Sequence, residues 1–364
     1  MSRRADDANV QKVPGARRER AGMLRRLLCA LASAVLILAP AELRADDATV
    51  NVGIGMTAAD APLMIADKLG FFKEQGITVN FVHFDAAAKM MAPLGTGQLD
   101  VAAGAPSAAL YNAILSNVDV KMVADKGSTP KGHGSQPLLV RKDLVTSGAY
   151  KSPKDLKGMT VAEGAQGTAG AAIVAKIATA AGLRYGDIKH VYMGFPQMVA
   201  ALQNKAIDAA VLSEPLATMA ERSGAAVRVV GDDVAYPDQQ LLALIYGGPF
   251  ITAKRALGEK FMVAYLKAVR VYDHANVDGH LRGLDSNRIV SIISDEMNVT
   301  DKSLLTDMTT PAYNPDGKLN LASLRADLDF FRDQGYVTGP LDIDKCVDPS
   351  FAASATKTLG PFKN

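Results

Sequence analysis

The sequence contains no tryptophan and only two cysteines among its 364 residues. Cys29 lies in an N-terminal segment that we expect to be removed, which leaves Cys346 as a single thiol. One cysteine can form neither an intrachain disulfide nor a cysteine metal cluster. The histidines are scattered without an HxxxH or HxxE spacing, so we predict no metal and no cofactor; they lie at positions 83, 133, 190, 274 and 280.

Motifs of covalent catalysis are missing as well. The sequence has no G-x-S-x-G motif, no Walker loop and no evident pairing of a nucleophile with a base. We therefore expect a protein that is not an enzyme.

The longest apolar run is shorter than the roughly 20 residues that a membrane-spanning helix needs. It covers residues 27–38, follows two arginines and precedes small residues. This arrangement is typical of a secretory signal peptide, here cleaved near Ala41 or Ala45. We expect residues 1–45 to be signal peptide and N-terminal extension and the mature chain to be periplasmic; a retained membrane anchor is the alternative.

The mature chain also lacks an excess of positive charge. Residues 1–45 carry nine Lys or Arg and four Asp or Glu, a net +5, so their removal takes the chain from +2 to −3. No Lys/Arg stripe remains to neutralise phosphates, and we exclude a nucleic-acid partner.

The first part of the mature chain reads as a βαβ unit. Alternating apolar residues at 50–54 predict a strand, and a helix follows with apolar residues at i, i+4 and i+7 from Ile65. The cassette KLGFFKEQG then stops this helix at Gly76, and residues 77–81 predict the next strand. A βαβ unit favours a parallel, doubly wound sheet.

A second pattern is an internal repeat. Residues 89–106 and 196–214 align at a constant offset, each with a helix, a polar turn and an apolar strand. Two copies so far apart predict two similar α/β lobes. Turn-rich residues 127–136 and the broken strand 241–250 indicate two crossings between them.

The predicted architecture is therefore α/β, with two doubly wound lobes, an interlobe cleft and two crossings. We assign residues 46–135 and 251–364 to lobe 1 and residues 136–250 to lobe 2. The largely helical region after residue 251 is expected to pack back on lobe 1.

Five segments together resemble one family. They are LGFFKEQGI at 69–77, GQLDVA at 97–102, SPKDLKGMTVAEG at 152–164, AALQNKAIDAAVLSEP at 200–215 and FFRDQGYV at 330–337. They resemble the periplasmic solute-binding proteins of ABC importers of the sulfonate, nitrate, taurine and thiamine-pyrimidine type. The resemblance implies a type II periplasmic-binding-protein fold, a small organic solute as ligand, and an ABC permease with its ATPase as partners.

The candidate ligand site follows from the strand ends. In open α/β sheets, ligands bind outside the carboxyl ends of the strands. The loops 55–60 and 164–168 occupy such ends in the two lobes, where helix N-termini favour anionic groups; the alternative is that they only make tight turns. The predicted ligand-binding residues are Met56, Thr57, Asp60, Ala105, Ser107, Gln166, Gly167, Thr168, Phe195, Ser213, Glu214 and Tyr246.

Acidic residues near the cleft bear on the charge of the ligand. Asp60, Glu163 and Glu214 argue against a multiply charged anion and for a ligand with donors or a positive group, unless they cap helices or face water. His133 lies in a crossing loop with Lys126 and Lys131, which either is solvated or steers anions.

Two aromatic candidates have equally ordinary structural roles. Phe195 either covers an apolar face of the ligand or packs on its own helix. Tyr246 either reaches the ligand with its hydroxyl or lies in the core with that hydroxyl hydrogen-bonded.

We expect a binding protein, with two alternatives on the same fold. One is an enzyme related to the pyrimidine-forming branch of the superfamily, although the cysteine-rich iron site of that branch is missing here. The other is a ligand sensor, which the sequence does not separate from a transport protein. The ligand class stays open among sulfonate, nitrate, pyrimidine, aromatic acid and amine.

Overall fold

The computed structural model describes residues 48–84 and 87–363. The predicted signal peptide and its cleavage sites lie outside these residues. Within the described part, no helix is both long and apolar enough to cross a bilayer.

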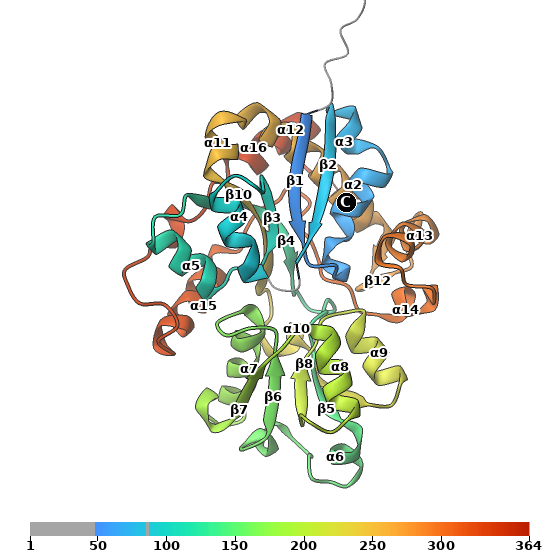
Figure 1. Cartoon of the computed structure of the whole chain (residues 1–364). Helices are drawn as coiled ribbons and strands as arrows, with labels where there is room; N and C mark the ends of the chain where they lie inside the picture. Colours follow the sequence, from blue (N-terminus) through green and yellow to red (C-terminus); the bar gives the residue numbers. More distant parts are fainter. Residues whose placement is uncertain (1–47, 85–86, 364) are drawn as a thin grey trace, which may run out of the picture. The chain divides into compact units, whose positions relative to one another are not determined.

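Lobe 1 is built on a five-stranded mixed sheet (Figure 1). The strands predicted at 50–54 and 77–81 are confirmed, and they pair in parallel with each other. In sheet order the strands are β2 (Ile77–His83), β1 (Ala48–Ile54), β3 (Val101–Gly104), β10 (Gln240–Gly247) and β4 (Val120–Ser128).

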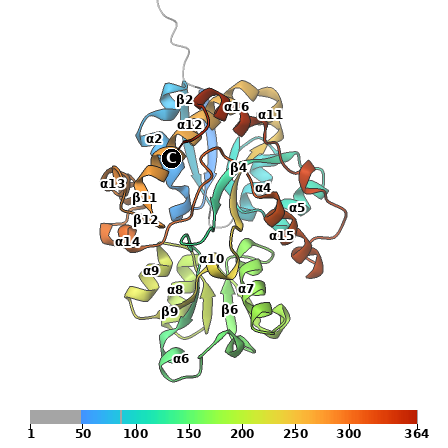
Figure 2. The same ribbon diagram turned by 180° about the vertical axis from the view of Figure 1, so that it is seen from behind.

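Helices cover both faces of this sheet, because its strands carry apolar residues on both sides. On one face lie α2 (Ala61–Lys68), α3 (Phe71–Glu74), α12 (Arg255–Ala275) and α16 (Ser350–Leu359), the last two side by side in Figure 2. On the other face lie α4 (Met91–Gly95), α5 (Ala108–Leu115) and α15 (Leu321–Asp333). The helices α11 (Gly248–Ala253), α13 (Ser286–Met297) and α14 (Lys302–Asp307) complete the lobe.

Lobe 2 repeats the same plan. Its sheet order is β7 (Lys189–Tyr192), β6 (Thr160–Glu163), β8 (Ala209–Val211), β5 (Leu138–Arg141) and β9 (Ala226–Val230). Helix α7 (Ala169–Ala180) covers one face, and α8 (Phe195–Gln203) and α9 (Leu216–Arg222) cover the other. The short helices α6 (Lys142–Thr146) and α10 (Asp232–Ala235) flank the sheet.

The predicted repeat and fold class are confirmed by this topology. Strand β3 lies beside β1 as β8 lies beside β6, both in parallel. The two repeat segments, 89–106 and 196–214, thus end in equivalent strands of two doubly wound lobes.

The second crossing differs from the predicted boundary. Residues 241–250 were assigned to lobe 2, but β10 pairs with β3 and β4 and belongs to the sheet of lobe 1. The chain therefore returns to lobe 1 about ten residues earlier than expected. An apolar strand looks the same from sequence in either lobe, and its partner strand decides where it lies.

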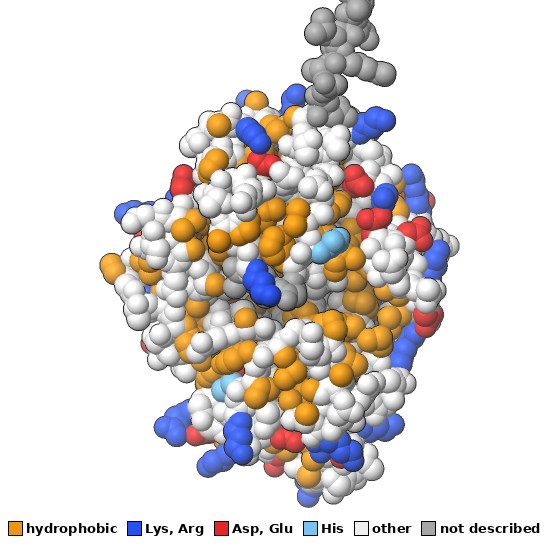
Figure 3. Space-filling view, viewed as in Figure 1, with side chains coloured by type: hydrophobic (Ala, Val, Ile, Leu, Met, Phe, Trp, Pro, Cys, Tyr) orange, Lys and Arg blue, Asp and Glu red, His pale blue; other side chains and the backbone are white. Residues whose placement is uncertain are grey.

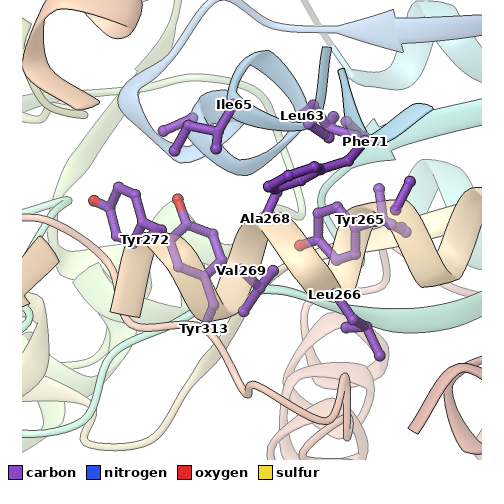
Figure 4. Close-up of a cluster of buried hydrophobic side chains, with 14 of the residues drawn as sticks. Leu63, Ile65, Phe71, Tyr265, Leu266, Ala268, Val269, Tyr272 and Tyr313 are labelled. Carbon is purple, nitrogen blue, oxygen red and sulfur yellow. The ribbon is translucent and has the colours of Figure 1, made fainter. Parts of the chain in front are cut away.

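The cassette KLGFFKEQG holds α2 and α3 against α12. Gly70 and Gly76 adopt φ of 78° and 69°, which lets the chain turn sharply on either side of α3. Phe72 is buried and stacks on Phe261 of α12 with ring centroids 4.8 Å apart. Figure 4 shows the neighbouring Phe71 in the same contact between the two helices.

Replacing Phe72 with alanine should remove this contact and leave a cavity in the core of lobe 1. We expect F72A to lower the free energy of unfolding by about 3–5 kcal/mol, measured by urea denaturation. Leu284→Ala is the control, because Leu284 is 70% exposed and its loss should cost less than about 0.5 kcal/mol. Equal losses in the two variants would contradict the scaffold role of the cassette.

Candidate functional site

A cavity of about 160 Å³ lies between the two lobes and is lined by residues of both. Its size compares with the roughly 150 Å³ of a cavity that admits benzene. Figure 3 shows a hollow at this level, with hydrophobic side chains along both edges. Of the predicted site residues, those that line the cavity are Thr57, Asp60, Ala105, Ser107, Gln166, Thr168 and Phe195. Their contact with a ligand stays a prediction.

The loop after β1 brings the first charged group to the cavity. Thr57 is the N-cap of a short 3₁₀ helix, and its backbone N–H donates to Asp60 Oδ2 at 3.0 Å. The other carboxylate oxygen of Asp60 lies 2.7 Å from Lys126 Nζ. Both side chains of this pair are 1% exposed, so the charges are enclosed in protein and need each other.

Lys126 was missed as a site residue. The sequence placed it with His133 and Lys131 in a crossing loop that either is solvated or steers anions, whereas the structure places it near the end of β4 and in the cavity wall. His133 is held elsewhere, with its Nδ1 3.1 Å from the carbonyl oxygen of Thr310. Among the described lining residues Lys126 is the one basic side chain, and its ammonium forms an ion pair with Asp60.

Glu214 does not line this cavity but the smaller hollow that adjoins it, and its contact with a ligand stays a prediction. Its carboxylate is 0% exposed and forms an ion pair with Arg228. It also accepts hydrogen bonds from the backbone N–H and the hydroxyl of Thr218, at 2.9 and 3.0 Å. Its negative charge is therefore compensated within lobe 2.

Glu163 is compensated in a similar way. Its side chain is fully buried, accepts from the hydroxyl of Tyr185 at 3.0 Å and lies 2.5 Å from His190 Nδ1. His190 Nε2 lies 2.9 Å from the carbonyl oxygen of Tyr185. Burial alone lowers the pKa of His190, but its bonds to Glu163 and Tyr185 and the charge of Glu163 outweigh it and raise the pKa.

These pairings overturn the argument that three carboxylates disfavour an anionic ligand. Asp60 is paired with Lys126, Glu163 with His190, and Glu214 with Arg228. A sequence shows the acids but not their partners, which come from distant strands.

Lobe 2 contributes a wall that is mostly uncharged. Thr168 is the N-cap residue of α7, and its hydroxyl donates to the carbonyl oxygen of Ala165 at 3.0 Å. Phe195 begins α8, with its ring beside Gly164. Across the cavity, Ser107 Oγ accepts from Leu110 N–H at 3.3 Å and so caps α5.

Four other predicted residues lie outside this cavity. Met56 packs against the core of lobe 1, and Ser213 lines a smaller adjoining hollow. Gly167 accepts a hydrogen bond from the backbone N–H of Ala108 at 2.8 Å, which joins the lobes. Tyr246 was wrong as a ligand residue: it is fully buried in lobe 1, and its hydroxyl donates to the carbonyl oxygen of Gly258 at 3.0 Å.

Apolar lining residues were also missed. Phe84 and Met90 follow β2, and the rule that ligands bind at carboxyl ends of strands could have found them. Leu241 and Leu242 come from β10, which the sequence had placed in the other lobe, and Gln136 from the first crossing.

The two lobes are in contact on both sides of the cavity. On one side, Arg222 of α9 forms two ion pairs with α14. One is with Asp301, the residue before the helix, at 2.9 Å, and the other is with Asp307, its last residue, at 2.5 Å. On the other side, Phe330 of α15 meets the ring of Tyr185 edge-on, with centroids 5.3 Å apart. These contacts join the two lobes on both flanks of the cavity.

Three buried acids lie around the crossings. Burial raises the pKa of Asp125 to about 6, although Asn314, Gln240 and Gly127 donate hydrogen bonds to it. Burial also raises the pKa of Asp232 and of Asp327 to about 7 each. Among the described residues, no group of three or more His, Cys, Asp or Glu is placed to hold a metal ion.

The comparisons with known proteins agree with this geometry. A model of the NMT1-like family matches residues 44–279. The chain belongs to the NMT1-like family. A Brucella abortus protein named as a binding protein is 23% identical over 322 residues, which cover 88% of this chain and 96% of that one.

Solved structures show the same fold at low identity. The nitrate-binding protein NrtA from Synechocystis superimposes with a TM-score of 0.72 at 14% identity, covering 86% of this chain and 89% of that one. The alkanesulfonate-binding protein SsuA from Xanthomonas axonopodis, bound to MOPS, gives 0.67 at 16% identity, with 84% and 99% covered. The desulfurization enzyme DszB gives 0.58 at 15% identity, with 86% and 99% covered.

The buried acids and His190 predict that stability falls as the pH rises. Each of these groups has a raised pKa in the folded state, which therefore binds more protons than the unfolded chain above about pH 4. We expect a higher Tm at pH 5 than at pH 8, measured by differential scanning fluorimetry. Replacing Asp232 and Asp327 with asparagine should reduce the difference in Tm between the two pH values. A wild-type Tm that rises from pH 5 to pH 8 would contradict the prediction.

Arg222 is predicted to hold the lobes closed. Because the ion pairs of Arg222 are exposed to solvent, their contribution to closure should be small and should weaken with salt. We expect R222A to shift the lobes toward an open arrangement, seen as a larger radius of gyration in small-angle scattering at low salt. Arg184→Ala is the control, since Arg184 pairs with Asp187 within lobe 2; an unchanged radius for R222A would exclude the role.

Proposed function

We propose that this protein is the solute-binding component of an ABC importer. It binds one small organic solute between its lobes in the periplasm and presents the closed, loaded form to a membrane permease, which works with its ATPase. The observation that carries the proposal is a solute-sized cavity lined by both lobes and flanked by contacts between them. Membership of the NMT1-like family and the names of the relatives support it.

The lining of the cavity supports an organic anion as the ligand. Lys126 offers a cationic group at one point of the wall, and because Asp60 shares its charge, one anionic group balances it best. Hydroxyls of Ser107 and Thr168 and the amide of Gln136 add neutral hydrogen-bonding groups. Such few polar groups in a mostly apolar site fix the orientation of a ligand.

The apolar part of the wall favours a ligand with an apolar body. Phe84, Met90, Phe195 and Leu242 line the cavity, and an ion as small as nitrate would leave them without a partner. A sulfonate or carboxylate attached to a ring or a short alkyl chain uses both parts of the site.

A thermal-shift screen of residues 46–364 tests this assignment. The panel contains benzoate, benzenesulfonate and butanesulfonate, together with benzylamine and butylamine as cations of similar size. We expect the anions to raise Tm and the amines not to, because a ligand at a hundredfold excess over Kd stabilises the folded form by about 2.7 kcal/mol. A shift with the amines alone would contradict the proposed charge.

Substitution of Lys126 localises the binding. K126M should raise the Kd of the tightest-binding anion at least tenfold, measured by isothermal titration calorimetry. Lys131→Met, at an exposed position of the first crossing, should leave this Kd unchanged. Because K126M leaves Asp60 buried without its partner, the double variant D60N/K126M is measured as well. Anion binding retained by the folded double variant would exclude Lys126 as the anion site.

A further inference from the structure

A second hollow adjoins the ligand cavity on lobe 2. It has a volume of about 390 Å³ and lies between the loop after β6 and the start of α8. We call it the outer groove and define it by Gln166, Tyr192, Met193 and Gln197. The cavity and the outer groove share Gly164, Ala165, Gln166 and Gly194 as lining residues, so they meet along these residues.

The boundary between the two hollows is formed mostly by residues with a small side chain or none, Gln166 excepted. Two of its four residues are glycine and one is alanine. Gly194 has φ of −65° and ψ of 152°, a conformation that any residue adopts, and the φ of Gly164 also lies outside the left-handed region. Backbone conformation therefore does not require glycine at either position.

Side chains cover both glycines. A Cβ on Gly194 would lie 2.4 Å from the amide oxygen at the flexible end of Gln197, so that side chain would have to shift. A Cβ on Gly164 would lie at an ordinary contact distance, 3.5 Å, from the ring of Phe195. The side chains of Phe195, in the cavity, and Gln197, in the outer groove, thus lie close over the main chain at the boundary. Larger residues here would separate the two hollows.

The outer groove differs in chemistry from the cavity. Its polar side chains are the amides of Gln166 and Gln197 and the hydroxyl of Tyr192, and its described lining residues include no charged group. Tyr192 is 41% exposed, which is unusual for a large aromatic side chain and offers a surface for stacking. A groove of this kind suits neutral groups that both donate and accept hydrogen bonds.

We propose that the ligand is longer than the cavity. Its anionic group and apolar part occupy the cavity, and a neutral hydrogen-bonding extension passes beside Ala165 into the outer groove. This inference rests on the proposed function and specifies its substrate class: an organic anion with an uncharged polar extension at the end opposite the anionic group.

The test uses benzoate and benzenesulfonate as parent compounds, each also prepared with one, two or three ethylene glycol units at the para position. Isothermal titration calorimetry measures Kd for the wild type, for Ala165→Leu and for Ala206→Leu. Ala165 lines both hollows, whereas Ala206 is exposed in a turn of lobe 2 and serves as the matched control.

For the wild type and for A206L, we expect the Kd of each extended compound to be no more than threefold above the Kd of its parent. A165L should weaken the binding of the extended compounds at least tenfold more than it weakens the binding of the parents, because leucine narrows the boundary. Circular dichroism shows that the variant is folded.

Three outcomes would overturn the inference. If the first glycol unit costs the wild type tenfold or more while the parents bind, the cavity is closed at that end and the proposed function stands without the extension. If A165L binds the extended compounds as the wild type does, they leave the cavity by another route. If neither parents nor extended compounds bind the wild type, the proposed ligand charge fails and this inference fails with it.

Discussion

The ion pair of Lys126 and Asp60 is the constraint on which the site depends. A buried charge is tolerated only beside a partner of opposite charge. The folded chain must therefore bring the loop after β1, which carries Asp60, against the end of β4, which carries Lys126. The pair therefore fixes the position of the 3₁₀ helix after β1 relative to the start of the first crossing. It also places in the cavity wall an ammonium whose charge Asp60 shares, as the proposed binding of a singly charged anion requires.

The contacts that close the lobes are of a different kind from those that line the cavity. Ala108 N–H donates to the carbonyl oxygen of Gly167, and the N–H of Ala58 lies 3.4 Å from the carbonyl oxygen of Glu214. Both bonds join main-chain atoms, so they do not depend on which side chains face the ligand. The side-chain contacts of Arg222 and Phe330 also lie outside the cavity lining, so different residues join the lobes and line the cavity.

Much of the fold followed from the sequence because its signals are local. Alternating residues, helix stripes and glycine stops gave the βαβ unit, and the repeat gave two lobes. The rule on strand ends also found Thr57, Ser107, Thr168 and Phe195 near the cavity. It failed for Tyr246, since a buried strand reads alike in core and cleft, and for Lys126, whose position depends on β4 pairing with β10 more than a hundred residues away. The pairing of Glu214 with Arg228 was hidden for the same reason.

Strand β10 lies between β3 and β4, although it follows the whole of lobe 2 along the chain. During synthesis the N-terminal part of lobe 1 thus emerges with β4 lacking its neighbour in the sheet, and with the edge of β3 open. Lobe 2, whose strands β5 to β9 are continuous in sequence, meets no such delay and can complete its own sheet first. Until residue 247 is available, the incomplete sheet of lobe 1 has unpaired strand edges, and such edges are prone to edge-to-edge association.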